Sequence, residues 1–351
     1  MFDDPYFDQH EMVACAADEA SGLRAIIAIH NTARGPSLGG VRVWPYESAA
    51  AAVGDALRLS RGMTYKSAMA DLPLGGGKSV VILPKGVAKT PAMLAALGRA
   101  IERLSGSYIA GQDVGTSEAD MAAIRRETRH VAGLSKAAGG VGSPSPTTAR
   151  GVFIGVRTTA EALGRDLSGL HVAIQGLGAV GFGLAERLHA AGARLTVADI
   201  DRTAVALAVD RFGATPASVA DILSVEADIV SPNALGGVLN AETIPRLRAA
   251  AVAGGANNQL ASDEDGAALH LRGILYAPDY VLNAGGVIRL CQEYFGWSGE
   301  MVDQRVEAIA TRLAAIFGEA QRTKTPTHRV ADAMSERHFR PPPGAPLAVS
   351  A

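Results

Sequence analysis

The feature that most constrains this 351-residue chain is a glycine-rich segment near its centre, HVAIQGLGAVGFGLAERLHAAGARLTVADID. An apolar strand at 171–175 precedes three glycines spaced as G-x-G-x-x-G, and an Ala- and Leu-rich helix follows them. A second strand at 194–198 ends at Asp199, 18 residues after Gly181. This order of strand, glycine turn, helix and strand predicts a βαβ unit of a Rossmann-type parallel sheet that binds a dinucleotide.

Each part of the motif has a physical task in such a unit. The first glycine makes a tight turn, the second lets the backbone approach a pyrophosphate, and the third allows close helix packing. Free N–H groups at the helix start attract phosphate, and Asp199 can accept both ribose hydroxyls while repelling a 2′-phosphate. We therefore expect NAD rather than NADP, although the cation Arg202 lies nearby; a glycine turn without ligand is the alternative. The expected cofactor contacts here are Gly176, Leu177, Gly178, Ala179, Val180, Gly181 and Asp199.

The rest of the chain predicts two domains. Candidate strands at 228–231, 250–253 and 273–276 extend the parallel sheet, and a long helical pattern covers 302–322. The Gly/Ser/Pro cluster at 139–146 predicts a domain boundary or hinge. We expect an α/β protein whose N-terminal α/β substrate and oligomerisation domain spans 1–140, completed by about 323–351. A Rossmann NAD-binding domain would span 145–322, with the active site in the interdomain cleft. The tail from Arg340 to Ala351 is expected to be frayed.

Two segments of the first third read as turn-rich, at 63–84 and 108–121. They follow an expected strand at 23–30 and an expected helix at 48–61, and a further helix is expected at 118–126. Lys78 follows three glycines and precedes an apolar strand, so its amine is expected to be crowded and partly desolvated. Desolvation lowers a lysine pKa towards neutrality, as a general base requires. A solvated lysine after a flexible turn is the alternative that these residues alone leave open.

Eight motifs occur in order along nearly the whole chain, from about Phe7 to Arg322. They are SLGGVRVWPY, GMTYKSA, LPLGGGKSV, GQDVGTSEADM, SPSPTTARGV, QGLGAVG, GGANNQL and APDYVLNAGGVI. Together they resemble the glutamate/leucine/phenylalanine/valine dehydrogenase family, and within it the leucine and phenylalanine branch.

The resemblance implies roles at the matching positions. Lys66 would bind the substrate carboxylate, Lys78 would activate the attacking water, and Asp113 would relay protons to and from the nitrogen. The other implied substrate contacts are Leu38, Gly39, Gly40, Met63, Gly111, Gln112, Asn257, Val287 and Leu290. The further implied cofactor contacts are Thr148, Ala234, Ala256, Asn257 and Asn283.

The implied reaction is NAD-dependent oxidative deamination of an apolar L-amino acid to a 2-oxo acid, ammonia and NADH, reversible as reductive amination. The implied pocket residues are uncharged, and burying an unpaired γ-carboxylate among them would cost roughly several kcal/mol, which argues against glutamate. Leu38 and Val287 resemble the leucine enzymes, whereas Gly111 and Leu290 resemble the phenylalanine enzymes. We expect a leucine-like substrate first and phenylalanine next. The family also implies a homo-oligomer.

Composition narrows the possible partners and the compartment. The net charge is −2 and no basic block occurs, so no nucleic acid or anionic membrane surface is expected to bind. The chain has no apolar run long enough to span a bilayer, and its acidic N-terminus does not resemble a signal peptide. Two cysteines, Cys15 and Cys291, suggest reduced thiols and a cytoplasmic enzyme.

Three other kinds of function have less support in the residues. No histidine spacing indicates a metal site, and His30 and His171 are expected to be structural. A hydroxy-acid dehydrogenase would need a His–carboxylate pair, which the sequence does not reveal. A silent NAD-binding regulatory protein would be expected to have lost Lys78 or Asp113. Arg42 has two possible roles on the sequence alone: contact with the cofactor pyrophosphate, or an interdomain ion pair.

Overall fold

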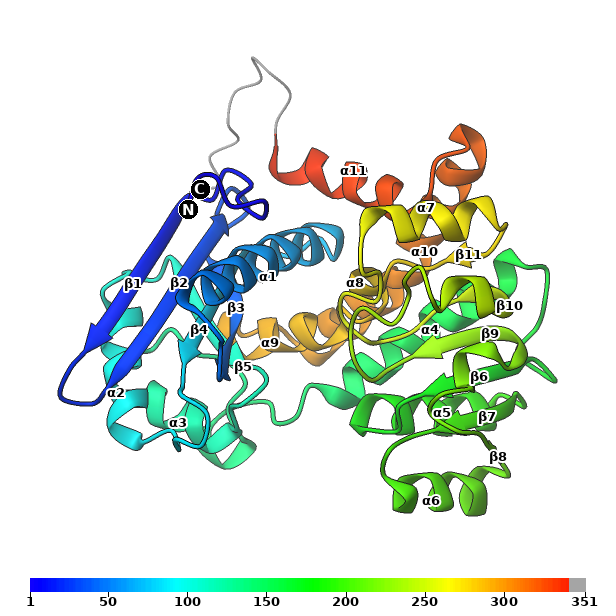
Figure 1. The fold of residues 1–351 in the computed structure, drawn as a ribbon, viewed down its shortest axis with the longest axis horizontal. Coiled ribbons are helices and arrows are strands. Elements are labelled where there is room, and N and C mark those ends of the chain that lie inside the picture. Colours follow the sequence, from blue (N-terminus) through cyan, green and yellow to red (C-terminus); the bar gives the residue numbers. More distant parts are fainter. Residues whose placement is uncertain (341–351) are drawn as a thin grey trace. The chain divides into compact units, whose positions relative to one another are not determined.

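The computed structural model describes residues 1–340, and the chain divides into two compact units (Figure 1). Of the described residues, unit 1 holds Met1–Ser143, Leu290–Trp297 and 335–340; unit 2 holds Pro144–Arg289 and Ser298–Met334. These limits differ from the expected ranges, because residues 290–297 belong to unit 1 and residues 323–334 to unit 2. The tail expected to be frayed lies outside the described residues, apart from Arg340.

Unit 1 is built on a five-stranded mixed sheet with the order β1-β2-β4-β3-β5. The two central strands β4 and β3 run parallel, β5 is parallel to β3, and β2 is antiparallel to both β1 and β4. The expected strand at 23–30 is confirmed as β2. The strands are β1 (Met12–Asp18), β2 (Leu23–Asn31), β3 (Ser37–Trp44), β4 (Gly75–Ile82) and β5 (Tyr108–Gln112).

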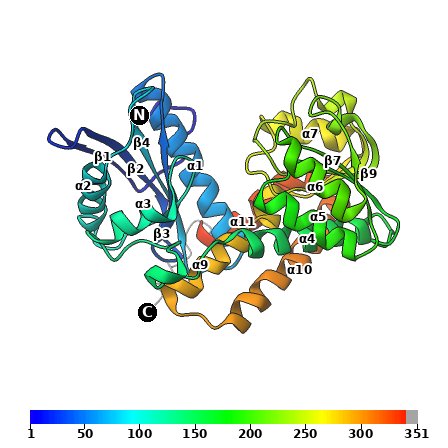
Figure 2. The same cartoon turned by 90° about the horizontal axis from the view of Figure 1, so that it is seen from below.

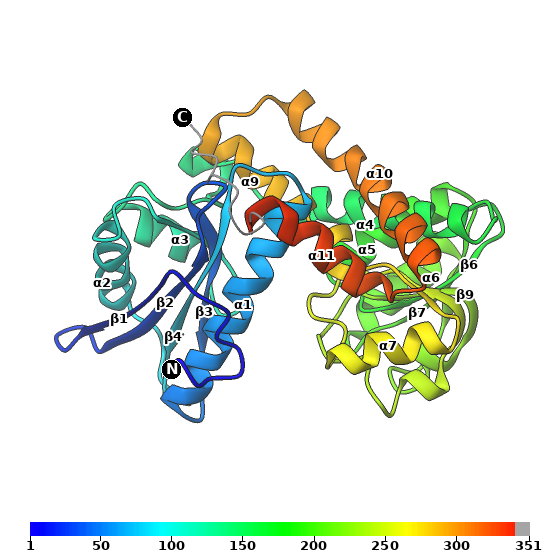
Figure 3. The same ribbon diagram turned by 90° about the horizontal axis from the view of Figure 1, so that it is seen from above.

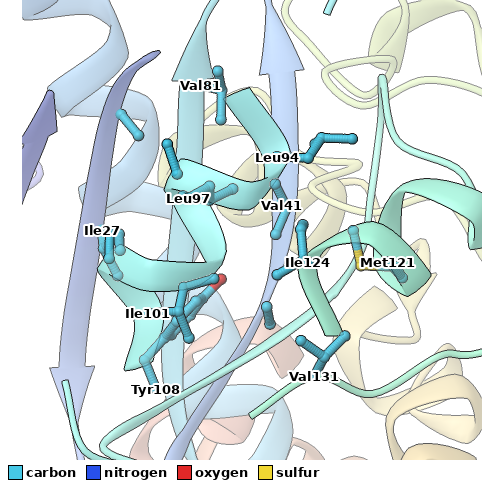
Figure 4. Packing of buried hydrophobic residues seen from close by; sticks show 14 of the residues in the cluster. Ile27, Val41, Val81, Leu94, Leu97, Ile101, Tyr108, Met121, Ile124 and Val131 are labelled. Carbon is cyan, nitrogen blue, oxygen red and sulfur yellow. The ribbon is translucent and has the colours of Figure 1, made fainter. Parts of the chain in front are cut away.

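Helices cover both faces of this sheet, as Figures 2 and 3 show. On one face, Ala52 and Ala56 of α1 (Ala49–Met69) pack against Ile26, Ala28 and Val80. On the other face, α2 (Pro91–Glu102) and α3 (Glu118–Arg125) contribute leucine, isoleucine and methionine side chains to a larger core (Figure 4). Since strand side chains alternate between faces, β3, β4 and β5 each present every second residue to the α1 side.

Capping residues explain where these helices begin. The Ser48 hydroxyl accepts the Ala51 N–H at the start of α1, and the Thr90 hydroxyl accepts the Met93 N–H at the start of α2. At α3, Ser117 and Asp120 form a reciprocal capping box, which confirms the expected helix there and selects Ser117 as its cap.

Helix α1 is longer than expected. The sequence pattern ended it at Arg61 and placed Met63–Lys66 in a turn-rich segment, but the helix continues to Met69. The added turns are held by packing, because every residue from Thr64 to Met69 is buried. Tertiary contact therefore outweighs the low helix propensity of Thr64 and Tyr65.

Unit 2 is built on a six-stranded parallel sheet with the order β11-β10-β9-β6-β7-β8. The strands expected at 171–175 and 194–198 are confirmed with the same limits, and the other three expected strands are found with shifted ends. The two-residue β8 was not expected. The strands are β6 (His171–Gln175), β7 (Arg194–Ala198), β8 (Thr215–Pro216), β9 (Glu226–Pro232), β10 (Arg248–Val252) and β11 (Leu275–Tyr276).

Helices alternate with these strands, which confirms the Rossmann-type fold. Figures 2 and 3 show α7 on the opposite side of the sheet from α4 and α10. The helices of this part of the chain are α4 (Ser145–Ala162), α5 (Ala179–Ala190), α6 (Arg202–Phe212), α7 (Asp263–Leu271), α8 (Asp279–Leu282), α9 (Gly285–Phe295), α10 (Gly299–Thr323) and α11 (Thr327–Phe339). Among residues 1–340, no helix is long and apolar enough to cross a membrane.

Candidate functional site

Three consecutive glycines position the start of β4. A Cβ at Gly75 would lie 1.9 Å from the Asn31 carbonyl oxygen, and one at Gly76 would lie 2.0 Å from the Thr64 backbone nitrogen of α1. A Cβ at Gly77 would lie 2.7 Å from the Tyr108 ring. Real side chains do not fit at such distances, so only glycine lets α1 and the neighbouring strands approach β4 here. The next residue along β4 is Lys78.

Lys78 is buried, and its amine forms a short ion pair with a carboxylate. The Lys78 Nζ lies 2.5 Å from Oδ2 of Asp113, which follows β5. Gly40 of β3 makes this approach possible, because a Cβ there would lie 2.6 Å from the Asp113 Cβ and 3.1 Å from the Lys78 Nζ. The sequence motifs that contain Gly40, Lys78 and Asp113 are thus brought to one place on the α1 face of the sheet.

Burial and neighbouring charges shift the pKa of both groups. Burial is the largest cause that lowers the pKa of the Lys78 amine; the Asp113 charge opposes it, and the positive charge of Arg42 adds to it. Burial alone would raise the pKa of the Asp113 carboxyl, but Lys78 and Arg42 outweigh burial and hold that pKa below its usual range. A buried amine with a lowered pKa beside a carboxylate that stays ionised is suited to proton transfer.

Lys66 lies on α1, on the same side of the sheet. Its side chain is buried, with the residue 9% exposed, and Met63 lies one turn earlier on the same face of the helix. A lysine carries a compact charge with three donors, which suits the capture of a carboxylate.

Apolar residues and glycines lie on this face as well. By strand alternation, Leu38 and Gly40 of β3 and Gly111 of β5 share it. The Leu290 side chain of α9 lies over Gly111, since a Cβ built there would be 3.8 Å from its Cδ1. Its other methyl group lies over Gly133, a residue that the sequence analysis did not single out. Val287, one turn before Leu290 on α9, is buried.

Two of the expected contacts in unit 1 differ from the prediction. Gln112 alternates to the opposite face from Gly111, where its exposed amide donates to the Thr116 carbonyl at 3.1 Å, so we leave it out of the proposed site. The Gly39 carbonyl accepts the Tyr108 hydroxyl at 2.8 Å. Gly39 therefore contributes by fixing the backbone of β3.

In unit 2 the glycine motif has the geometry that its residues require. Gly176 has φ +92°, a conformation that side chains disfavour, and Gly178 is the extended N-cap of α5. A Cβ at Gly181 would lie 2.0 Å from the Gly176 carbonyl oxygen, so the helix packs directly on the turn. The Asp199 carboxylate accepts the Leu177 N–H at 2.5 Å and the Asp201 N–H at 2.8 Å. The start of α5 and a fixed carboxylate thus lie at the carboxyl end of β6 and β7.

The other expected cofactor residues of unit 2 lie around the same edge of the sheet. A Cβ at Gly176 would lie 2.9 Å from the Ala234 Cβ, which follows β9.

The Asn283 amide donates to the Gly255 carbonyl and to Oδ1 of Asn257 at 2.8 Å, beyond the end of β10. Ala256, which lies between Gly255 and Asn257 in the sequence, is buried. Thr148, in the first turn of α4, lies against Gly286, where a Cβ would be 2.8 Å from its hydroxyl.

One polar atom of this group has no partner. Asn283 is buried, and its Oδ1 accepts no hydrogen bond within the part of the chain that the structure describes. A buried carbonyl oxygen left unpaired costs about 1–3 kcal/mol, so a ligand that donates a hydrogen bond there would be stabilised. Together with the open glycine turn, this orphaned acceptor fits a dinucleotide with a carboxamide group.

The interpretation of Arg42 changes. Its guanidinium donates to Asp113 at 3.0 Å and to Asp55 of α1 at 2.9 Å, both within unit 1. Both earlier alternatives, the cofactor pyrophosphate and an interdomain ion pair, are therefore replaced by a network inside one unit. The available signal was a single arginine in the otherwise apolar strand sequence SLGGVRVW.

Several expectations outside the site can be compared directly. His30 is buried and hydrogen-bonds with Thr64, and the half-buried His171 hydrogen-bonds with Thr196. Cys15 and Cys291 are not joined in a disulfide, and Cys291 is buried. No cluster of three metal-ligating side chains exists among residues 1–340.

Comparison with known proteins connects both units to one family. The family model described as Glu/Leu/Phe/Val dehydrogenase, dimerisation domain, matches residues 8–130, and the model described as Glutamate/Leucine/Phenylalanine/Valine dehydrogenase matches 204–337. A model for the NAD binding domain of D-isomer specific 2-hydroxyacid dehydrogenases also matches 146–253, which covers only nucleotide-domain sequence.

Individual relatives match along nearly the whole chain. The leucine dehydrogenase of Geobacillus stearothermophilus is 49% identical over 94% of this chain and 90% of its own length. The phenylalanine dehydrogenase of Bacillus thermotolerans is 42% identical over 95% of this chain and 89% of its own length. The crystal structure of the L-tryptophan dehydrogenase from Nostoc punctiforme superposes with a TM-score of 0.82 at 41% identity, covering 94% of this chain and 96% of that one. The chain is therefore a member of the glutamate/leucine/phenylalanine/valine dehydrogenase family, within its leucine and phenylalanine branch.

Proposed function

We propose that this protein catalyses the NAD-dependent oxidative deamination of an apolar L-amino acid. The reaction consumes the amino acid, NAD and water, and yields the 2-oxo acid, ammonia, NADH and a proton. The observation that carries the proposal is the buried Lys78–Asp113 pair, whose ion-pair distance is 2.5 Å, in a chain that also holds a complete dinucleotide-binding turn. The activities named for the relatives, on leucine, tryptophan and phenylalanine, support an apolar substrate.

The residues divide the chemistry between them. Lys66 holds the substrate carboxylate as a point charge. NAD, when held by unit 2, would supply the hydride acceptor for oxidation of the substrate Cα to an imine. Lys78 in its neutral form takes a proton from the water that attacks the imine carbon. Asp113, which is ionised at the start, first accepts a proton from the ammonium group of the substrate and later returns it to the departing nitrogen. Burial lowers the pKa of the Lys78 amine and so increases the neutral fraction that the attack of water requires.

The cofactor contacts follow from unit 2. The N–H groups at the start of α5 and the open Gly178 would receive the pyrophosphate, and Asp199 would accept the ribose hydroxyls. The unpaired Oδ1 of Asn283 would accept a hydrogen bond from the nicotinamide carboxamide. Thr148, Ala234, Ala256 and Asn257 would complete the surroundings of the ring.

The glycines next to Leu290 indicate which substrate side chain the enzyme accepts. Gly111 and Gly133 leave room beside its methyl groups, and burying an aliphatic or aromatic substrate side chain would contribute about 1.5–3 kcal/mol. We propose leucine-like substrates first and phenylalanine next. Because the family model over residues 8–130 is described as a dimerisation domain, we also propose a homo-oligomer, which light scattering on the purified protein would test.

The test is NADH formation, followed by absorbance, with purified protein and a panel of L-amino acids at alkaline pH. We expect turnover with leucine and phenylalanine and little with glutamate. Lys78→Ala should lower kcat by about 10²–10⁴-fold, since it removes the proposed general base. Arg42 still pairs with Asp113 in that variant, so no carboxylate is left buried alone. No turnover across the panel by protein that still binds NADH would refute the proposal.

A further inference from the structure

Arg42 also contacts Asp113, but it has no role in the mechanism described above. Its Nε donates to Oδ2 of Asp113 at 3.0 Å, and this is the same oxygen that the Lys78 amine contacts. The carboxylate therefore lies between a lysine, which gains and loses a proton, and a guanidinium, which stays charged at every pH of interest. Asp113 keeps one cationic partner when Lys78 is neutral.

A second carboxylate holds this guanidinium in place. Nη1 of Arg42 donates to Oδ2 of Asp55 at 2.9 Å, and the Tyr46 hydroxyl donates to the same oxygen at 2.7 Å. Arg58 donates to the other oxygen of Asp55 at 2.8 Å. With two donors of its fork fixed to different carboxylates, Arg42 has little freedom to turn away from Asp113.

We propose that Arg42 is a positioning residue for the dehydrogenase reaction, one that keeps Asp113 ionised and aligned while Lys78 exchanges its proton. The proposal rests on the proposed function of Lys78 and Asp113. Arg42 acts through these two residues and needs no contact with the substrate.

The direction of the effect follows from the charges. The groups that act on Lys78 are Asp113 after β5, Arg42 on β3 and Asp55 on α1, with Tyr46 and Arg58 joined through Asp55. The positive charge of Arg42 lowers the pKa of both Lys78 and Asp113. Removing that charge raises both values, so more of Lys78 stays protonated and unable to accept a proton from water.

The experiment compares the pH profile of kcat/KM for the wild type, Arg42→Gln, Arg42→Lys and Arg58→Gln, with an apolar amino acid and NAD. In Arg42→Gln the acidic limb of the profile should move to higher pH by about one unit. The loss of kcat/KM is then about tenfold below the limb and shrinks at high pH. Arg42→Lys should return the limb towards its original position. Arg58→Gln removes an ion pair with Asp55 and keeps Arg42, so it should leave the limb in place.

A second measurement needs no turnover. The folded pKa of Asp113 is lowered, so its ion pairs stabilise the fold above the usual carboxyl pKa, and this stability is lost as the pH falls through the lowered value. Without Arg42 this contribution should be smaller, so Arg42→Gln should have a lower apparent Tm than the wild type at neutral pH and should lose less of its Tm on acidification. Arg42→Lys should restore both. An unshifted limb in Arg42→Gln, with activity lost equally at every pH, would overturn the proposal. Wild-type protein inactive on all amino acids would refute the proposed function, whereas an unchanged acid decline of the Tm would still count against Arg42.

Discussion

At the scale of single residues, each candidate site depends on a charged side chain whose position is determined by backbone N–H groups or by a glycine that allows close approach. Gly40 lets Lys78 and Asp113 meet, and in unit 2 two backbone N–H groups fix the carboxylate of Asp199. A carboxylate fixed in this way loses little freedom when a ligand binds, so its hydrogen bonds contribute more of their strength to affinity.

Replacing Asp199 by Asn should therefore weaken the binding of NADH. It should also reduce the difference between the affinities for NADH and for NADPH. Hydrogen bonds to a charged group are worth about 1.5–3 kcal/mol, which corresponds to roughly a 10- to 100-fold rise in the Kd for NADH. The asparagine oxygen can still accept the Leu177 N–H, so the turn should survive. Fluorescence titration with both cofactors measures the change.

The matched control is Asp201→Asn, which removes an equal charge two residues away. Asp201 caps α6 through the Thr203 N–H, and asparagine caps equally well. An equal loss of NADH affinity in both variants would assign the effect to net charge and would contradict a specific role for Asp199.

At the scale of elements, the sequence pattern predicted the limits of an element best where the element's own residues determine them. Strands β6 and β7 were predicted residue for residue, because short apolar runs bounded by turn residues define them. The last two turns of α1 were missed, since burial against β4 stabilises them and their own propensity is low. The Arg42 network was missed for a related reason: it joins residues 42, 55 and 113, and no periodicity links them.

The contact between α1 and β4 gives a pair of opposite predictions. Gly76→Ala would place a Cβ 2.0 Å from the Thr64 nitrogen, so it should lower stability by several kcal/mol and reduce activity with it. Gly62→Ala, on α1 itself, meets no atom within 4 Å and should stabilise the helix by about 0.5–1 kcal/mol. Thermal melting of both variants tests the close approach; similar Tm values for the two would contradict it.

At the scale of the whole molecule, the proposed mechanism divides the chemistry between the two units. Unit 1 has its own core and holds Lys66, Lys78 and Asp113, whereas unit 2 has its own core and holds the residues proposed to contact the cofactor. Hydride transfer requires both sets at once, but binding of the cofactor alone requires only the second. The division makes catalysis and cofactor binding separable by mutation.

This separation predicts that Lys78→Ala loses turnover and keeps cofactor binding. NADH at 100 times its Kd stabilises the folded state by about 2.7 kcal/mol, which for a unit of this size raises the apparent Tm by about 5–10 °C. Lys78→Ala should show the full rise, and Asp199→Asn a smaller one at the same NADH concentration, because only the second change touches unit 2. A melting series with and without NADH measures this for all three proteins. If Lys78→Ala lost the stabilisation as well, the cofactor would depend on unit 1, and the division of labour proposed for the two units would be wrong.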